Sequence, residues 1–130
     1  MSLPEPLDAP DAHDALLKLE AQQREWDMRA REVQGKAAQA YARLVDIALH
    51  SQTGQAQRVA LFLAAAYNGS AYQFDLFDLR AVDVEISDDM LVCIDALRWG
   101  RADLYNLLPG GDAPILEIIR IWQIGATSDS

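Results

Sequence analysis

A regular spacing of apolar and small side chains within residues 16–47 constrains the fold of this chain more than any other feature. The positions lie alternately three and four residues apart for more than four heptads: Leu16, Leu19, Gln23, Trp26, Ala30, Val33, Ala37, Ala40, Leu44 and Ile47. This spacing keeps one face of an α-helix apolar. Charge pairs four residues apart, such as Glu20 with Arg24, support an exposed opposite face. The pattern predicts one helix over residues 12–51, or a helical hairpin.

The length of this helix predicts either a bend or self-association. At 1.5 Å per residue it would span about 60 Å, more than a compact domain of this size needs. We therefore expect the chain either to bend at Gly35 or to self-associate as a homodimer. The residues expected to form this oligomerisation stripe are Leu16, Leu19, Trp26 and Val33.

The rest of the chain predicts shorter helices over residues 54–68, 75–82, 87–99 and 112–124. Candidate N-caps precede them at Thr53, Asp75, Ser87 and Asp112, and Gly100 is a candidate stop. On the third of these helices we expect an inward row of Met90, Leu91, Ile94 and Leu97. Only residues 82–86 alternate like a strand, and a single short strand has no partner. The expected fold class is all-α, a small helical bundle with a long N-terminal heptad-patterned helix or helical hairpin.

Composition predicts one domain. The chain has 130 residues and is 51% hydrophobic, which is enough for one core. We expect loose tails at residues 1–11 and 125–130, and a single helical domain over residues 12–124. Within that domain, residues 12–51 form the long helix or hairpin and residues 54–124 form a compact core.

The charge balance narrows the possible partners. The formal net charge is −9, from 11 basic and 20 acidic side chains, so direct binding to a nucleic-acid backbone is disfavoured. No apolar run is long enough for a membrane span, and the acidic, proline-rich start is unlike a secretory signal. We expect a cytoplasmic protein. Cys93 is the single cysteine, which excludes an intramolecular disulfide and predicts a buried structural thiol.

An acidic segment over residues 75–95 is the main electrostatic feature, with seven acidic side chains against Arg80 alone. We expect it to contact the basic surface of a protein partner. The alternative interpretation is a solvated face whose carboxylates cap helices and favour the helix dipole. The candidate partner-binding residues are Asp75, Asp78, Asp83, Glu85, Asp88 and Asp89.

Other chemistry has less support. The spacing of Asp83, Glu85, Ser87 and Asp89 imitates a calcium loop, but Asp88 stands where that loop needs glycine and Ile94 where it needs glutamate. His13 and His50 lack metal-ligand spacing, and no glycine pattern indicates a phosphate loop. We expect no catalytic residues, no metal and no cofactor. The larger aromatic side chains are expected in the core, with an aromatic pocket as the alternative: Tyr67, Tyr72, Trp99, Tyr105 and Trp122.

Residues 58–122 carry a family resemblance. The matching runs are RVALFLAAAYNG, FDLFDLRAVDVEISDDML and ILEIIRIW. The positions that carry it are Arg58, Val59, Ala60, Phe62, Leu63, Asn68, Phe74, Asp75, Leu76, Asp78, Leu79, Val82, Asp83, Ile86, Asp88, Asp89, Met90, Leu91 and Trp122. The chain resembles a family of small uncharacterised proteobacterial proteins encoded on plasmids and integrative elements. The resemblance implies a mobile-element setting, in which small acidic proteins regulate transfer or block host defences.

These observations predict a non-enzymatic, acidic protein-interaction module that binds a protein partner, self-associates through the N-terminal helix, or does both. One alternative is an anti-defence inhibitor whose carboxylates mimic nucleic acid on a host nucleic-acid-binding protein. A second alternative is a carboxylate-dependent hydrolase. A self-contained helical bundle with solvated acidic side chains is the simplest interpretation of the same features.

Overall fold

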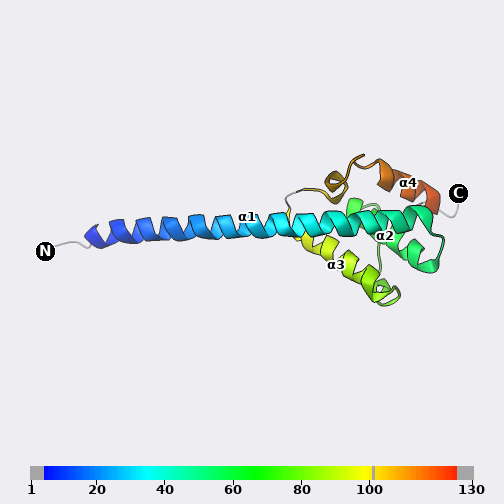
Figure 1. Ribbon diagram of the computed structural model, residues 1–130, viewed down its shortest axis with the longest axis horizontal. Helices are drawn as coiled ribbons and strands as arrows, with labels where there is room; N and C mark the ends of the chain where they lie inside the picture. The colour runs from blue at the N-terminus through cyan, green and yellow to red at the C-terminus, as the bar shows by residue number, and fades with distance from the viewer. Residues whose placement is uncertain (1–4, 101, 126–130) are drawn as a thin grey trace. The chain divides into compact units, whose positions relative to one another are not determined.

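The computed structural model describes residues 5–100 and 102–125, and it is all-α there, with no strand in those residues. Four α-helices and two short 3-10 helices follow one another along the chain (Figure 1): α1 (Glu5–His50), α2 (Gly54–Tyr67), η1 (Leu76–Arg80), α3 (Val84–Trp99), η2 (Leu104–Leu107) and α4 (Ala113–Trp122). The predicted fold class is confirmed. Of the two predicted forms of the N-terminal region, the chain adopts the long helix, and Gly35 does not interrupt it.

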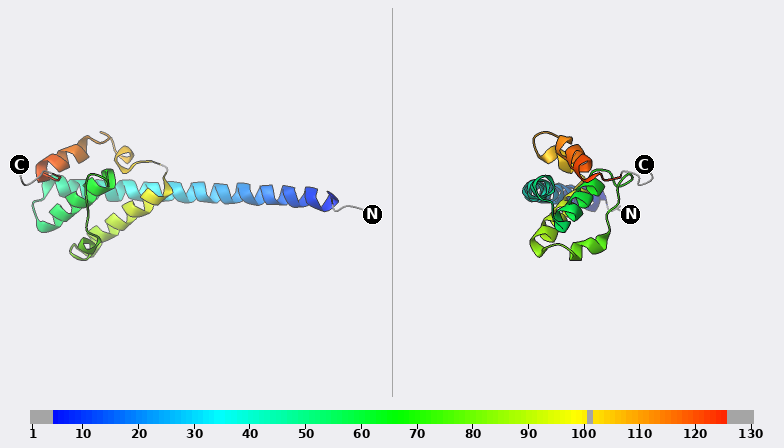
Figure 2. Two further views of the ribbon diagram at one scale, coloured as in Figure 1. Left: turned by 180° about the vertical axis from the view of Figure 1, so that it is seen from behind. Right: turned by 90° about the vertical axis from the view of Figure 1, so that its right-hand side faces the viewer.

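The chain divides into an N-terminal unit, residues 1–32, and a C-terminal unit, residues 33–130. In the C-terminal unit, α2, α3 and α4 gather along the last part of α1 (Figure 2). The buried side chains come from all four α-helices: Ala37, Ala40, Tyr41, Leu44, Val45 and Ala48 from α1; Val59, Ala60, Phe62 and Leu63 from α2; Met90, Cys93 and Ala96 from α3; and Ile115 and Ile118 from α4. The second half of the heptad stripe therefore belongs to the core of this unit.

Local sequence explains several helix ends. The Thr53 side chain accepts a hydrogen bond from the backbone N–H of Ala56 at 3.1 Å, as predicted for an N-cap. Gly100 ends α3 in the left-handed conformation, with φ 62°, which glycine adopts without steric cost. Near the end of α4, the indole N–H of Trp122 donates to the carbonyl of Ala48 at 2.8 Å and fastens that helix to α1.

Several helix boundaries differ from the sequence prediction. Residues 5–11, predicted as part of a loose tail, belong to α1; Pro6 lies in the first turn, where a missing N–H removes no helical hydrogen bond. The predicted helix over residues 75–82 is the five-residue 3-10 helix η1. The last helix starts after Asp112, whose carboxylate makes no cap bond and instead accepts from the hydroxyl of Tyr67 at 3.0 Å.

The start and orientation of α3 are the larger corrections. It begins at Val84, so the prediction of Ser87 as its N-cap is wrong; the Ser87 hydroxyl donates to the Val84 carbonyl inside the helix. The strand-like alternation of residues 82–86 therefore ends in the first turn of a helix. The buried row is Met90, Cys93 and Ala96, whereas Leu91 and Leu97, both predicted to point inward, are exposed.

Candidate functional site

Two of the predicted partner-binding carboxylates, Asp75 and Asp78, contact other groups of the same chain. Asp75 is the N-cap of η1 and accepts a hydrogen bond from the backbone N–H of Phe77 at 2.9 Å. Asp78 lies 3.4 Å from the guanidinium of Arg58 on α2, and both side chains are partly buried. Asp78 is therefore paired within the fold, whereas Asp75 caps η1 and stays exposed.

Asp89 makes stronger contacts than Asp75 and Asp78 do. Its two carboxylate oxygens accept from two guanidinium nitrogens of Arg43 on α1, at 2.9 and 2.8 Å. The Asp89 side chain is only 15% exposed. A paired geometry of this kind is the strongest that arginine makes with a carboxylate, and it ties α3 to α1. The hydrogen bond and the charge of Asp89 raise the pKa of Arg43 above its ordinary value.

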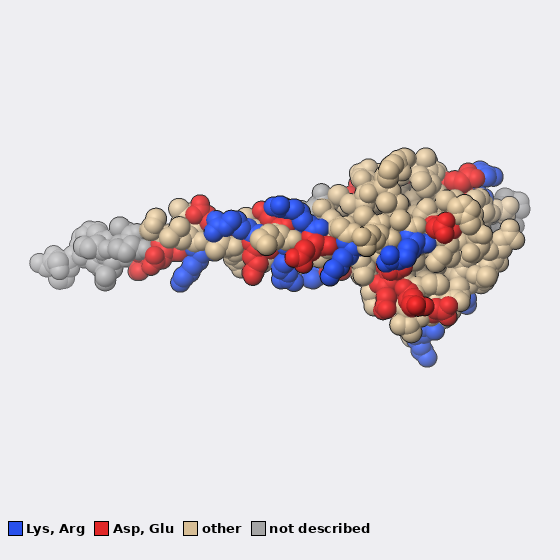
Figure 3. Space-filling model, viewed as in Figure 1, with Lys and Arg blue, Asp and Glu red and all other residues tan. Residues whose placement is uncertain are grey.

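Four members of the predicted set are exposed: Asp75 at the start of η1, and Asp83, Glu85 and Asp88 at the N-terminal end of α3. Asp83 contacts Gln55 twice: its N–H donates to the side-chain oxygen at 2.6 Å, and its carboxylate accepts from the side-chain nitrogen at 3.4 Å. For Glu85 and Asp88, no ion pair or side-chain hydrogen bond is found within residues 5–100 and 102–125. Figure 3 shows acidic side chains gathered on one face of the C-terminal unit, with basic side chains beside them.

The outer face of α3 carries apolar side chains that the sequence prediction missed. Val84 is 73% exposed and Leu91 is 52% exposed, and with Asp88 they follow one another at helical spacing along α3. We call Val84, Glu85, Asp88 and Leu91 the α3 outer face. Val84, Asp88 and Leu91 lie opposite the buried row of Met90, Cys93 and Ala96, and Glu85 flanks them. The sequence would have predicted this face if the inward row had been chosen correctly.

In the N-terminal unit, the predicted stripe is exposed. Leu16 is 54%, Leu19 62% and Trp26 42% exposed, so each leaves much of its apolar surface in water. Val33, the fourth predicted stripe residue, lies in the C-terminal unit and is partly buried against its core. The exposed part of the stripe therefore consists of Leu16, Leu19, Gln23 and Trp26, and we refer to these four as the exposed stripe.

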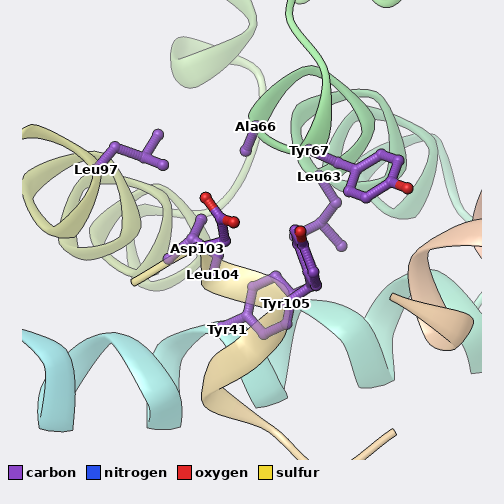
Figure 4. A pocket seen from close by; sticks show the side chains of 8 residues that line it. All are labelled: Tyr41, Leu63, Ala66, Tyr67, Leu97, Asp103, Leu104 and Tyr105. Atoms are coloured by element: carbon purple, nitrogen blue, oxygen red, sulfur yellow. The ribbon is translucent and has the colours of Figure 1, made fainter. Parts of the chain in front are cut away.

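Three of the five aromatic side chains predicted for the core, Tyr67, Tyr105 and Trp122, pack against the core of the C-terminal unit, whereas Tyr72 and Trp99 are only partly buried outside it. Tyr67 and Tyr105 pack edge to face with ring centres 5.4 Å apart. Beside them, a cavity of about 30 Å³ is lined by these two side chains together with Tyr41 and Asp103 (Figure 4). Its volume suits one or two water molecules and excludes a larger ligand. A hydrogen bond to Asp103 raises the pKa of Tyr105, and burial raises that of Tyr41.

The structure gives no geometry for metal or thiol chemistry in the part that it describes. No group of three or more potential metal-ligating side chains occurs there. The calcium-like spacing that starts at Asp83 falls on helix α3 and not on a loop. Cys93 is fully buried, and burial raises the pKa of its thiol to about 12, with a smaller contribution from the charge of Asp89. None of the described helices is long and apolar enough to cross a membrane.

Comparison with known proteins places the C-terminal unit in a family. No curated protein and no solved structure matches the chain. A family model with the description "Family of unknown function (DUF7673)" matches residues 38–123. The match starts well before Arg58, where the sequence resemblance begins, and it takes in most of the buried part of α1; the exposed stripe lies outside it. The chain belongs to this family of unknown function.

Proposed function

We propose that this chain is a non-enzymatic interaction module that self-associates through the exposed stripe of α1. The observation that carries the proposal is the exposure of Leu16, Leu19 and Trp26 on one helical face. Their alternating spacing of three and four residues is the pattern by which one helix packs along another. Large apolar side chains grouped on one exposed face are typical of an interaction surface, whereas single exposed ones need no explanation.

Light scattering over a wide range of protein concentration tests this proposal. We expect a mass that rises above the monomer value of 14.4 kDa as concentration increases. Leu19→Glu with Trp26→Glu should abolish the rise, because each places a charge in an apolar seam. Ala21→Glu introduces the same side chain outside the stripe and should leave the rise unchanged. A parent protein that stays at 14.4 kDa throughout would reject self-association.

The α3 outer face supports a second function, the binding of a protein partner with a basic surface. Exposed Val84 and Leu91 beside Glu85 and Asp88 combine apolar contact area with negative charge. Exposed apolar area favours a protein partner, because a face that only contacts water gains no stability from apolar side chains. If the mobile-element setting implied by the sequence resemblance holds, that partner is a host nucleic-acid-binding protein whose groove the carboxylates occupy.

Variants that neutralise acidic side chains of the α3 outer face test this second function. Asp83 is a poor probe because it contacts Gln55. Glu85→Gln with Asp88→Asn removes two charges without touching those contacts. For partners recovered from a bacterial lysate, this variant should associate more slowly and with a weaker dependence on salt.

The matched control makes the same charge change elsewhere, at Asp14→Asn and Glu25→Gln, two exposed carboxylates on α1 outside the exposed stripe. Equal association rates and equal salt dependence for parent, variant and control would show that the α3 outer face is not the docking surface. Because Glu85 lies in the first turn of α3, the stability of its variant is measured alongside by denaturant unfolding.

A further inference from the structure

The residues that flank the exposed stripe carry information about the orientation of the partner helix. When Leu16 and Gln23 are assigned to heptad position a, Leu19 and Trp26 fall at position d. Positions e and g, which border the seam and meet the partner helix, are then fixed. Position e is occupied by Glu20 and Asp27, and position g by Ala15, Gln22 and Arg29.

The two possible orientations of a second copy bring different flanking positions together. In a parallel pair, position e of one helix faces position g of the other. Glu20 would then face Ala15 of the second copy, and Asp27 would face Gln22, so no like charges meet. In an antiparallel pair, e faces e, and Glu20 meets Glu20 or Asp27 of the other helix. Like charges in such contact are destabilising.

More distant charges have less influence on orientation. The N-terminal part of the segment is richer in acidic side chains, such as Asp14, and the following part carries Arg29 and Arg31. This gradient by itself would favour the antiparallel orientation. However, charges away from the seam face water and are screened over about 8 Å at physiological salt, whereas the e and g side chains are in contact. The contacts at the seam therefore decide the orientation.

Gln23 adds to the specificity of the seam. It is the polar residue at an a position, and its amide donates to the carboxylate of Asp27 at 3.2 Å, at the border of the stripe. A polar side chain at one a position lowers the stability of a helix pair but fixes its register. In a parallel pair in register, Gln23 faces its own copy across the seam. In an antiparallel pair it faces Leu19 or Trp26, which leaves its amide against an apolar side chain.

We propose that the exposed stripe binds a second copy of this chain in parallel orientation and in register. This inference rests on the proposed self-association and adds its geometry. The occupant that we propose is another copy, because the e and g side chains of two copies meet without like-charge contact in the parallel orientation. Residues 11–32 would then be a dimerisation segment attached to the family domain.

Disulfide trapping in the full chain tests the orientation. Ala12 continues the stripe at a d position, where a parallel pair brings the two copies within the 4.4 to 6.8 Å Cα separation, roughly, that a disulfide spans. In an antiparallel pair centred on the exposed stripe, the two Ala12 positions are more than about 25 Å apart at 1.5 Å per residue. Ala21→Cys, at an outward f position, is the matched control, and buried Cys93 is present in both variants.

We expect Ala12→Cys to form a covalent dimer roughly 10-fold or more faster than Ala21→Cys, because pairing raises the effective thiol concentration into the millimolar range. Light scattering on the reduced proteins is measured in parallel. A non-covalent dimer in which Ala12→Cys is trapped no faster than Ala21→Cys would overturn the parallel orientation and leave self-association standing. A monomer at all concentrations would overturn both.

Discussion

Two stretches of α1 share one heptad pattern and differ in their surroundings. In residues 37–48 the stripe is buried, and Leu44 has no exposed surface. In residues 16–26 it is exposed, and Leu19 keeps 62% of its surface in water. The buried stretch is rich in alanine, at Ala37, Ala40 and Ala48, which gives neighbouring helices room for their larger side chains. The exposed stretch carries leucine and tryptophan instead.

The comparison separates what a periodic pattern reveals from what it leaves open. Spacing identifies which face of a helix is apolar, but it is silent on what covers that face. Side-chain size supplies only part of the missing information. The buried stretch contains alanines that leave room for neighbouring helices, but it also contains Tyr41 and Leu44, which are as buried as those alanines. The family match, which begins at residue 38, separates the same two stretches.

Truncating a leucine in each stretch should produce the largest contrast. Leu44→Ala leaves a cavity in a packed core and should lower the free energy of unfolding by about 2 to 5 kcal/mol. Leu19→Ala removes an exposed side chain and should change it by less than about 0.5 kcal/mol in dilute protein. Denaturant unfolding at low concentration measures both. Equal losses would mean that the N-terminal stripe is covered within its own chain.

Alkaline pH should lower the stability of the core around the buried stretch. The thiol of Cys93 has a pKa raised to about 12 by burial, and the hydroxyl of Tyr41 on α1 has a raised pKa for the same reason. A group whose pKa is higher in the folded state favours unfolding as it loses its proton. The contribution of Cys93 is therefore complete below about pH 9 and falls as the pH approaches 12. Thermal unfolding between pH 8 and pH 11 should show a decreasing midpoint.

The same burial predicts slow chemistry at Cys93. A thiol reagent should react with the native protein at a small fraction of the rate seen in denaturant, since the thiolate is the reactive form and is disfavoured by burial. Rapid labelling of the native protein at neutral pH would show that α3 opens away from the buried stretch of α1.

Replacing the glycine between the two stretches should give the smallest effect. Gly35 is helical and exposed, and nothing lies within 4 Å of the position that a β-carbon would occupy. Gly35→Ala should stabilise the helix by about 0.5 to 1 kcal/mol, because alanine has the higher helix propensity. Circular dichroism during thermal unfolding measures the change. A lower midpoint would mean that the helix does not remain regular through residue 35.

Local signals predicted much of the fold. The heptad spacing, the Thr53 cap and the Gly100 stop each act within a few residues, and the structure confirms all three. The row of α3 that points inward was harder to predict, because Leu91 and Leu97 are as apolar as the buried Met90. Only the packing of α3 against other helices decides between these faces.

The acidic segment shows why the site was harder to predict than the fold. Its local sequence contains one base, yet the fold brings Arg58 to Asp78 and Arg43 to Asp89 from other helices. These partners lie 20 and 46 residues away, so no local pattern reveals them. Glu85 and Asp88, the two carboxylates proposed to meet a partner, differ from their neighbours in their tertiary surroundings and not in residue type.

Amide hydrogen exchange along α1, measured at several protein concentrations, tests the contrast between its two stretches most directly. We predict strong protection of residues 37–48 at every concentration, because that stretch is part of a folded core. Residues 16–26 should exchange quickly in dilute protein and become protected as concentration rises, because pairing with a second copy buries the stripe. Protection of residues 16–26 that does not change with concentration, whether strong or absent, would contradict this account.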